Sequence, residues 1–323
     1  MYFGFLLAAY SVIANDVIQT LGTFLSSNEN RRWWVLWTFA GFVLMISLVY
    51  GWVINDGDVT YGRLIGDAKQ YSFENPIYPN PTDIDGFNWL YLLPPIILLL
   101  ITRIGIPVST SFLILTFFNP KNLQSMAIKS MVGYFLAFVA AFLIYLTITK
   151  LAERKFLERV ATTTERNIWT ALQWLSTAFL WVQWLIQDFA NIYVFLPRKV
   201  DSFTLFWTLL VFLILLGYIF YNKGGTIQSI VKSKTNTSDI RSATIIDFVY
   251  GLVLYYFKEL NNVPMSTTWV FIGLLAGREL GIKLINNKKW DKATLKDISY
   301  DLGKVFFGLT ISVSLVYLIK WIT

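Results

Sequence analysis

Two short runs of hydroxyl residues interrupt apolar stretches of this chain, and each has the composition of an anion site. The first run is IPVSTSF, Ile106–Phe112, and the second is VPMSTTW, Val263–Trp269. Proline breaks a helix, and a Ser or Thr that follows it is a favoured first residue for a new helix. The start of that helix leaves about four backbone N–H groups free and carries the positive end of the helix dipole. Both features favour a bound anion, and three adjacent hydroxyls add further donors.

The two runs match position by position, in the order apolar, Pro, apolar, Ser, Thr, Ser or Thr, aromatic. If the two helix starts met, their N–H and O–H donors would form a cradle for an oxyanion without any Arg or Lys. For one run alone, the alternative is that the hydroxyls cap short helices or bond backward to carbonyls. The matching pair favours the cradle, whose predicted residues are Ser109, Thr110, Ser111, Ser266, Thr267 and Thr268.

A second pair of motifs combines one carboxylate with two amides in apolar surroundings. NDVIQ covers Asn15–Gln19, and QDFAN covers Gln187–Asn191. In each motif the aspartate and the last amide are three residues apart, which places them on one face of a helix. Carboxylate and amide oxygens are hard ligands that suit Na⁺, by analogy with other hard cations. The predicted cation ligands are Asn15, Asp16, Gln19, Gln187, Asp188 and Asn191.

The alternative for these aspartates is a protonated side chain bonded to a neighbouring helix, with H⁺ in place of the metal cation. A third aspartate, Asp247, is either a further cation ligand or a charge at a helix start, and we favour the helix start. Lys258 and Glu259 are neighbours expected to form an ion pair. Arg103 and Lys258 stand at matching turns, where they would attract anions into each vestibule.

The elements that must position these residues are long apolar helices. The chain has 323 residues, of which 55% are hydrophobic and 15% are charged, whereas soluble domains carry about 25% charge. About 20 apolar residues are needed to cross a bilayer. A carboxylate at bilayer depth costs about 2.5–3.5 kcal/mol and usually serves a function. We predict an all-α polytopic membrane protein, with clear spans at Trp33–Ile54, Met126–Thr149, Ile168–Leu196, Phe203–Tyr221 and Leu302–Ile322.

Composition excludes several chemistries. The chain contains no Cys and no His, which removes disulfides, thiol nucleophiles, iron–sulfur clusters, Cys or His zinc sites and histidine acid–base catalysis. We also expect no catalytic residues, no cofactor, and no metal ion beyond Na⁺. The net charge of +7 is read as the excess of basic residues in cytoplasmic loops rather than as a nucleic-acid surface. The first residues, MYFGFLL, lack the basic region of a cleaved signal peptide.

Charge also predicts the orientation in the membrane. The long segment 55–87 is acidic, and if the basic segments face the cytoplasm it lies outside together with both termini. The protein is then a multi-pass protein of the cell membrane, inner or plasma. The basic segments are Asn28–Arg32, Lys150–Arg166, Asn222–Arg241 and Arg278–Ile298.

Two interrupted segments, 88–118 and 245–277, each resemble a re-entrant hairpin of two short helices. With these hairpins, each half of the chain has about three crossings, so the second half enters from the opposite side. That is the inverted-repeat architecture of many secondary transporters, whose sites lie at the repeat interface. The first repeat is 1–150, with the acidic loop 55–87. An interfacial connector, 151–166, leads to the second repeat, 167–323, with an interfacial segment at 278–300.

The order of the four motifs resembles the inorganic phosphate transporter (PiT) family, whose members carry tandem G-x-N-D-x-x-N and P-x-S-T-T motifs. The resemblance implies cation-coupled import of inorganic phosphate, with the hydroxyl runs on the anion and the aspartate motifs on Na⁺. A homodimer is compatible with it. Where the family often ends its second motif in His, this chain has Phe112 and Trp269, and Ile13 or Ala14 replaces the family glycine.

Four alternatives remain from the sequence, one of which is a channel or receptor of unknown ligand. Sulfate or another tetrahedral oxyanion would suit the same donors, and H⁺ would suit the same carboxylates. An intramembrane prenyltransferase-like enzyme is the last alternative, because such enzymes hold Mg²⁺ and a diphosphate with N-D-x-x-D motifs. Both NDVIQ and QDFAN lack the second Asp of that motif.

Overall fold

The computed structural model describes residues 1–67, 69–84, 89–103, 108–148, 162–224, 240–260, 264–287 and 292–322. Within these ranges the regular structure is helical, and no β-strand occurs. Six helices of the described chain are long and apolar enough to cross a membrane. The predicted connector 151–166 and the tips of both predicted hairpins fall largely or wholly outside the described residues. The all-α polytopic fold class predicted from composition is confirmed.

The first crossing is a composite rod that holds the first aspartate motif. It consists of α1 (Tyr2–Val12), a π-helical turn η1 (Ile13–Val17) and α2 (Ile18–Ser27). In the most apolar 18-residue stretch of this rod, 78% of the residues are buried. The corresponding share is 33% for α3 (Trp33–Ile54), which follows it. The rod is therefore an inner helix of the bundle, and α3 presents most of its surface outward. The other long helices are α6 (Leu123–Ile148), α8 (Thr163–Tyr193), α9 (Ser202–Tyr221) and α13 (Lys292–Ile322).

The two interrupted segments differ in length. The first is short, as predicted, with η2 (Trp89–Leu92), α4 (Leu93–Arg103) and α5 (Thr110–Phe118), and η3 (Pro120–Asn122) leads on to α6. The second is longer than predicted, because α11 (Ile240–Leu260) and α12 (Thr267–Asn287) have 21 residues each. Much of the predicted interfacial segment 278–300 is therefore the end of α12 and the start of α13.

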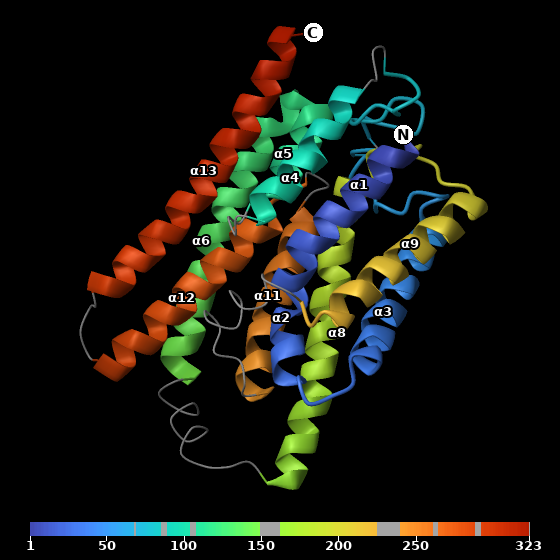
Figure 1. The fold of residues 1–323 in the computed structure, drawn as a ribbon. Coiled ribbons are helices and arrows are strands. Elements are labelled where there is room, and N and C mark those ends of the chain that lie inside the picture. The colour runs from blue at the N-terminus through green and yellow to red at the C-terminus, as the bar shows by residue number, and fades with distance from the viewer. Residues whose placement is uncertain are drawn as a thin grey trace.

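The two helix pairs occupy different ends of the molecule (Figure 1). The pair α4–α5 lies toward the end that carries both chain termini, whereas α11 and α12 extend from the middle toward the other end. Such an arrangement is what two inverted repeats would give. The repeat relationship itself stays a prediction.

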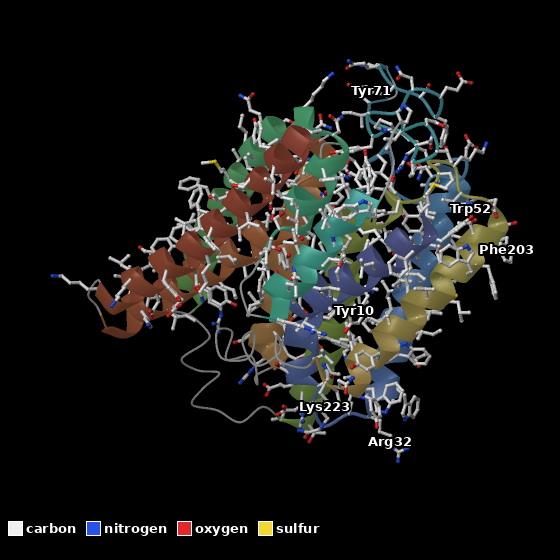
Figure 2. The ribbon with its side chains drawn as sticks, turned by 45° about the horizontal axis from the view of Figure 1, so that its top comes forward. Tyr10, Arg32, Trp52, Tyr71, Phe203 and Lys223 are labelled. Atoms are coloured by element: carbon white, nitrogen blue, oxygen red, sulfur yellow. The ribbon has the colours of Figure 1, made fainter. Side chains whose placement is uncertain are left out.

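The ends of the bundle also differ in their residues. Arg32 and Lys223 lie together at one end, and Trp52, Tyr71 and Phe203 lie at the other (Figure 2). The termini and the connection after α3 share the second end (Figure 1). This grouping agrees with the predicted topology, in which both termini and the acidic loop lie on one side. Which end faces the cytoplasm stays a prediction.

The segment between α3 and η2 packs onto the bundle. We call its residues 55–84 the α3–η2 loop. The backbone N–H of Val200, at the α8–α9 turn, donates to the carbonyl of Gly57 at 2.9 Å. The side-chain amide of Asn119, which follows α5, donates to the backbone carbonyl of Ile77 at 2.6 Å. Tyr78 of the loop is fully buried. The loop was expected only as a long acidic connection, and it is instead a folded cap on α5 and α8.

Helices α6 and α12 approach each other very closely, because glycines face the partner backbone. A Cβ placed on Gly273 would lie 2.3 Å from the carbonyl oxygen of Tyr134, and one on Gly277 would lie 2.1 Å from that of Phe138. Small residues four apart are the usual means by which membrane helices reach such contact. This packing fixes the start of α12, which carries the second hydroxyl run, against α6.

The substitution Gly277→Ala tests this packing. We expect it to lower the free energy of unfolding by about 1–3 kcal/mol, because the added methyl group must push two backbones apart. The thermal midpoint of the purified protein in detergent is the measurement. Gly303→Ala is the control, since no atom lies within 4 Å of a Cβ placed there. Equal midpoints for the two variants would contradict the close contact.

Candidate anion and cation site

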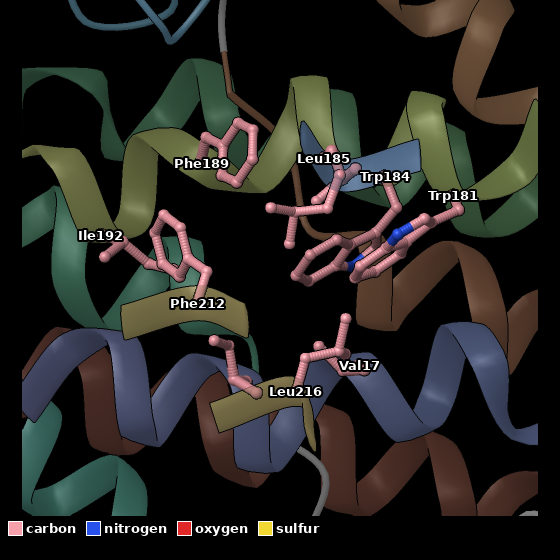
Figure 3. Close-up of a pocket in the computed structure, with 10 residues that line it drawn as sticks. Val17, Trp181, Trp184, Leu185, Phe189, Ile192, Phe212 and Leu216 are labelled. Atoms are coloured by element: carbon pink, nitrogen blue, oxygen red, sulfur yellow. The ribbon is translucent and has the colours of Figure 1, made fainter. Parts of the chain in front are cut away.

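The first aspartate motif lies where its helix changes form. Asn15 and Asp16 belong to the π-helical turn η1, and both are buried. A π-helical turn inside a longer helix is rare and is frequently found at functional sites. Ile13 and Val17 of the same turn line a small pocket with Trp181, Trp184 and other apolar side chains of α3, α8 and α9 (Figure 3). Because that pocket is lined entirely by apolar and aromatic residues, it offers no anion site.

A chain of hydrogen bonds joins the two aspartate motifs through the first hydroxyl run. The hydroxyl of Thr110 donates to Oδ2 of Asp16 at 2.8 Å. The side-chain amide of Asn191 donates to the same hydroxyl at 3.0 Å and to Oδ1 of Asp188 at 2.7 Å. The four residues come from η1, α5 and α8, and each is at most 2% exposed. Residues predicted from separate motifs therefore form one buried cluster.

The two hydroxyl runs also contact each other in a matched way. Ser111 donates its hydroxyl to the carbonyl of Met265 at 3.2 Å. Thr268, at the matching position of the second run, donates to the carbonyl of Val108 at 3.5 Å. Phe112 and Trp269 are the aromatic residues that end the two runs, and the centroids of their rings lie 5.7 Å apart. The starts of α5 and α12 therefore meet, as the cradle requires.

The serines of the runs act as helix caps. Ser109 Oγ accepts the backbone N–H of Phe112 at 3.3 Å, and Ser266 Oγ accepts that of Trp269 at 3.2 Å. The capping alternative thus applies to these two oxygen atoms. A capping hydroxyl still has its own proton to donate, so the serines keep the capacity to bind an anion. Thr267 lies beside Asp188, and Thr268 beside Asp16.

The second aspartate motif holds three buried oxygen atoms that accept no hydrogen bond from the part of the chain that the structure describes. They are Oε1 of Gln187, Oδ2 of Asp188 and Oδ1 of Asn191. Buried acceptors are normally satisfied, and an exception calls for an explanation such as an ion. A hard cation fits this set of one carboxylate and two amide oxygens. No group of three acidic side chains occurs among the described residues, so a divalent metal site of that kind is not present there.

The first motif is arranged differently from its twin. Asn15 donates to Asp16 Oδ1 at 2.7 Å and to the Val108 carbonyl at 3.1 Å, and accepts from Thr102 at 3.1 Å. Gln19 donates its amide to the backbone carbonyl of Asn15 at 3.2 Å. The three-residue spacing was read as ordinary α-helix, and the π-helical turn changes that register. Gln19 is buried, and its amide nitrogen bonds to the backbone of its own helix.

Asp247 is not a helix-start charge. The first turn of α11 contains no acidic residue, and Asp247 is fully buried farther along that helix. Thr23 donates its hydroxyl to one carboxylate oxygen, and Thr177 donates to the other at 2.5 Å. The interpretation that we favoured is therefore wrong, because a buried helix face, and not the helix end, holds this residue. The expected pair Lys258–Glu259 does form, at 3.3 Å.

Several residues around the cluster were not predicted. The hydroxyl of Tyr250 in α11 donates to the Thr267 carbonyl at 3.0 Å. Ser130 in α6 accepts the backbone N–H of Ser266 at 2.8 Å. Arg63 of the α3–η2 loop is 1% exposed and lies within the electrostatic range of Asp188. None of these three residues belongs to a motif that occurs in both halves of the sequence. Such repeated motifs were the signal that identified the other site residues.

Comparison with known proteins gives one result. No family model matches the chain, and no curated protein matches it. A solved structure described as the sodium-dependent phosphate transporter matches it with a TM-score of 0.57, over 99% of this chain and 98% of that one, at 17% sequence identity. This chain has the fold of that transporter. The resemblance drawn from four short motifs is thereby confirmed at the level of the fold.

Proposed function

We propose that the chain imports inorganic phosphate across the cell membrane together with Na⁺. The observation that carries this proposal is the hydrogen-bond chain from Asp16 through Thr110 and Asn191 to Asp188. It joins an aspartate motif from each half of the chain to Thr110 at the start of α5. The start of α12 contacts the start of α5 through the hydroxyls of Ser111 and Thr268. The fold of a sodium-dependent phosphate transporter supports the same assignment.

The anion would be held at the two helix starts. Free backbone N–H groups, the helix dipoles and the hydroxyls of both runs supply donors for a tetrahedral oxyanion. The proposed ligands are Ser109, Thr110, Ser111, Ser266, Thr267 and Thr268, all of which are buried. Binding through several weak donors allows the anion to be released again.

The cation would be held by the aspartate motifs, with Asp188, Gln187 and Asn191 as the best-supported ligands. Their three unpartnered oxygens fit Na⁺. Asp16 and Asn15 belong to the same hydrogen-bonded cluster and are the proposed ligands from the first motif. Gln19 is included because its side chain lies beside Asn15. A bound cation offsets the charge of the carboxylates and of the anion, so each ligand improves the site for the other.

Transport would follow from movement of one repeat against the other around this fixed site. We place repeat 1–150 against repeat 167–323, with both termini outside. Sulfate as the substrate and H⁺ as the coupling ion are the competing assignments within the same fold. A prenyltransferase-like activity has no support in the fold match, and a homodimer is not required by the site.

Uptake of labelled phosphate into proteoliposomes tests the proposal. An inward Na⁺ gradient should drive accumulation, and an equal K⁺ gradient should not. Unlabelled phosphate should compete and sulfate should not. If sulfate competes as well as phosphate does, the substrate assignment is wrong, and uptake that follows a proton gradient alone would replace Na⁺ by H⁺.

A further inference from the structure

The second hydroxyl run is held by side chains from two neighbouring helices. Tyr250 in α11 donates its hydroxyl to the backbone carbonyl of Thr267 at 3.0 Å. Ser130 in α6 accepts the backbone N–H of Ser266 at 2.8 Å. Ser130 is fully buried, and Tyr250 is 1% exposed. Two consecutive residues at the start of α12 are therefore fixed from two sides.

These contacts lie where the helix start has N–H groups to offer a ligand. The N–H of Ser266 is used by Ser130, and Ser266 Oγ accepts the N–H of Trp269 at 3.2 Å. Thr267 and Thr268 are the first two residues of α12, and residues in these positions have no acceptor within their own helix. Their two N–H groups are therefore the backbone donors with which this helix start can hold an anion.

Tyr250 bonds to the peptide unit that carries one of these two donors. The carbonyl of Thr267 and the N–H of Thr268 belong to the same peptide unit, so a proton donated to the carbonyl draws electron density away from the N–H. Hydrogen bonds linked in this way strengthen one another by about 10–30% each. Tyr250 also lies within the electrostatic range of Asp16 and Asp188. Its hydrogen bond therefore belongs to the candidate site and improves the Thr268 N–H as a donor.

The two halves of the chain differ at this position. In the first half, the residue at the same distance before the matching proline is Leu93, which has no group to donate. The ring of Tyr250 also packs on Phe271 of α12, with the ring centroids 5.7 Å apart. A buried tyrosine hydroxyl usually finds a partner, and here both the hydroxyl and the ring contact α12. We therefore expect the second hydroxyl run to contribute more of the anion affinity than the first.

We propose that Tyr250 and Ser130 are positioning residues for the oxyanion, which hold the start of α12 in the conformation that binds it. Tyr250 has the additional role of strengthening the Thr268 N–H. Donors that are already fixed bind more tightly, because less conformational freedom is lost when the ligand arrives. This inference rests on the proposed function and adds two residues that belong to neither the hydroxyl runs nor the aspartate motifs.

The test compares Tyr250→Phe with the unaltered protein in proteoliposomes at saturating Na⁺. Phenylalanine keeps the ring beside Phe271 and removes only the donated proton. We expect KM for labelled phosphate to rise about 3- to 10-fold, the usual effect of losing one neutral hydrogen bond. Vmax and the Na⁺ concentration for half-maximal uptake should change little. Tyr193→Phe is the matched control, because it removes a buried phenol hydroxyl that bonds to Thr208 at 2.8 Å, outside both hydroxyl runs, and it should keep the normal KM.

Ser130→Ala removes the second contact and should also raise KM for phosphate. It keeps the inference testable if Tyr250→Phe does not fold, since an unchanged KM in Ser130→Ala would then overturn it. Thermal stabilisation of the purified proteins by phosphate is a readout that does not need transport, and both variants should require more phosphate for the same stabilisation.

A purely structural role gives a different pattern. If Tyr250→Phe lowers the thermal midpoint and Vmax but leaves KM for phosphate unchanged, the inference is overturned. An equal rise of KM in Tyr193→Phe, or a rise in the Na⁺ requirement alone, overturns it as well. If the unaltered protein shows neither uptake of phosphate nor stabilisation by it, the proposed function is rejected and the inference with it.

Discussion

In the Asp188→Asn variant, phosphate uptake should no longer respond to Na⁺. Asp188 contributes the one negative charge among three buried oxygen atoms that accept no hydrogen bond from the described part of the chain. Asparagine has nearly the same shape but no charge, so it removes most of the attraction for a cation. Because coupling between two ligands typically changes affinity about 5- to 150-fold, we expect the benefit of Na⁺ on phosphate affinity to fall from that range to about one. Uptake measured over a series of Na⁺ concentrations provides the check.

Two controls make the Asp188→Asn result specific. Asp67→Asn alters an exposed aspartate of the α3–η2 loop and should leave the Na⁺ response as it is. The thermal midpoint of Asp188→Asn in detergent should stay close to that of the unaltered protein, since Asn191 can still donate to the remaining oxygen. A variant that keeps the normal Na⁺ response would remove Asp188 from the cation site. If uptake by the unaltered protein follows a proton gradient and Asp188→Asn loses that response, Asp188 carries a coupled proton instead of binding Na⁺.

The long helices were predictable because lipid imposes a simple rule on sequence. The predicted span Trp33–Ile54 is α3, and Phe203–Tyr221 is α9 apart from its first residue. A polar residue inside such a span is conspicuous, and so are two matching polar runs. The cluster of Asp16, Thr110 and Asp188 was therefore open to prediction, because each member stands out against apolar neighbours and each motif has a twin.

Three features lay beyond the sequence for physical reasons. The π-helical turn at Ile13–Val17 depends on tertiary packing, and no local propensity marks it, so the position of Gln19 relative to Asp16 could not be predicted. The lengths of α11 and α12 were underestimated, because buried partners such as α6 tolerate charged and small residues in α12 that lipid would not. Arg63 lies in a loop, where residues follow no period, and only folding of that loop brings it within electrostatic range of Asp188.

The bonding of Thr110 suggests how the two ligands depend on each other. A hydroxyl has one proton, and that of Thr110 is donated to Asp16 at 2.8 Å. To donate to an anion instead, Thr110 must release Asp16, which then lacks a partner for that oxygen. A cation beside Asp16 would replace the lost bond. Binding of the cation would thereby make the Thr110 proton available, which is a local reason for the two ligands to bind together.

Thr110→Val should therefore weaken both ligands at once. Valine keeps the shape of threonine but removes the hydroxyl that bonds to Asp16 and Asn191. Each buried group left without its partner costs about 1–3 kcal/mol, so we expect uptake at low phosphate and low Na⁺ to fall about 10- to 100-fold. The measurement is the initial rate of phosphate uptake over a grid of both concentrations, in which KM for phosphate and the Na⁺ requirement should rise together.

Two variants on the same helix separate this role from a general effect of losing a hydroxyl. Thr110→Ser keeps the hydroxyl and should recover most of the uptake. Thr116→Val removes a buried hydroxyl of α5 that donates to the carbonyl of Phe112 in its own helix, so both ligand dependences should stay normal. If Thr110→Val changes KM for phosphate but not the Na⁺ requirement, Thr110 is an anion ligand only. Coupling would then have to pass through Asp188 and Asn191 without it.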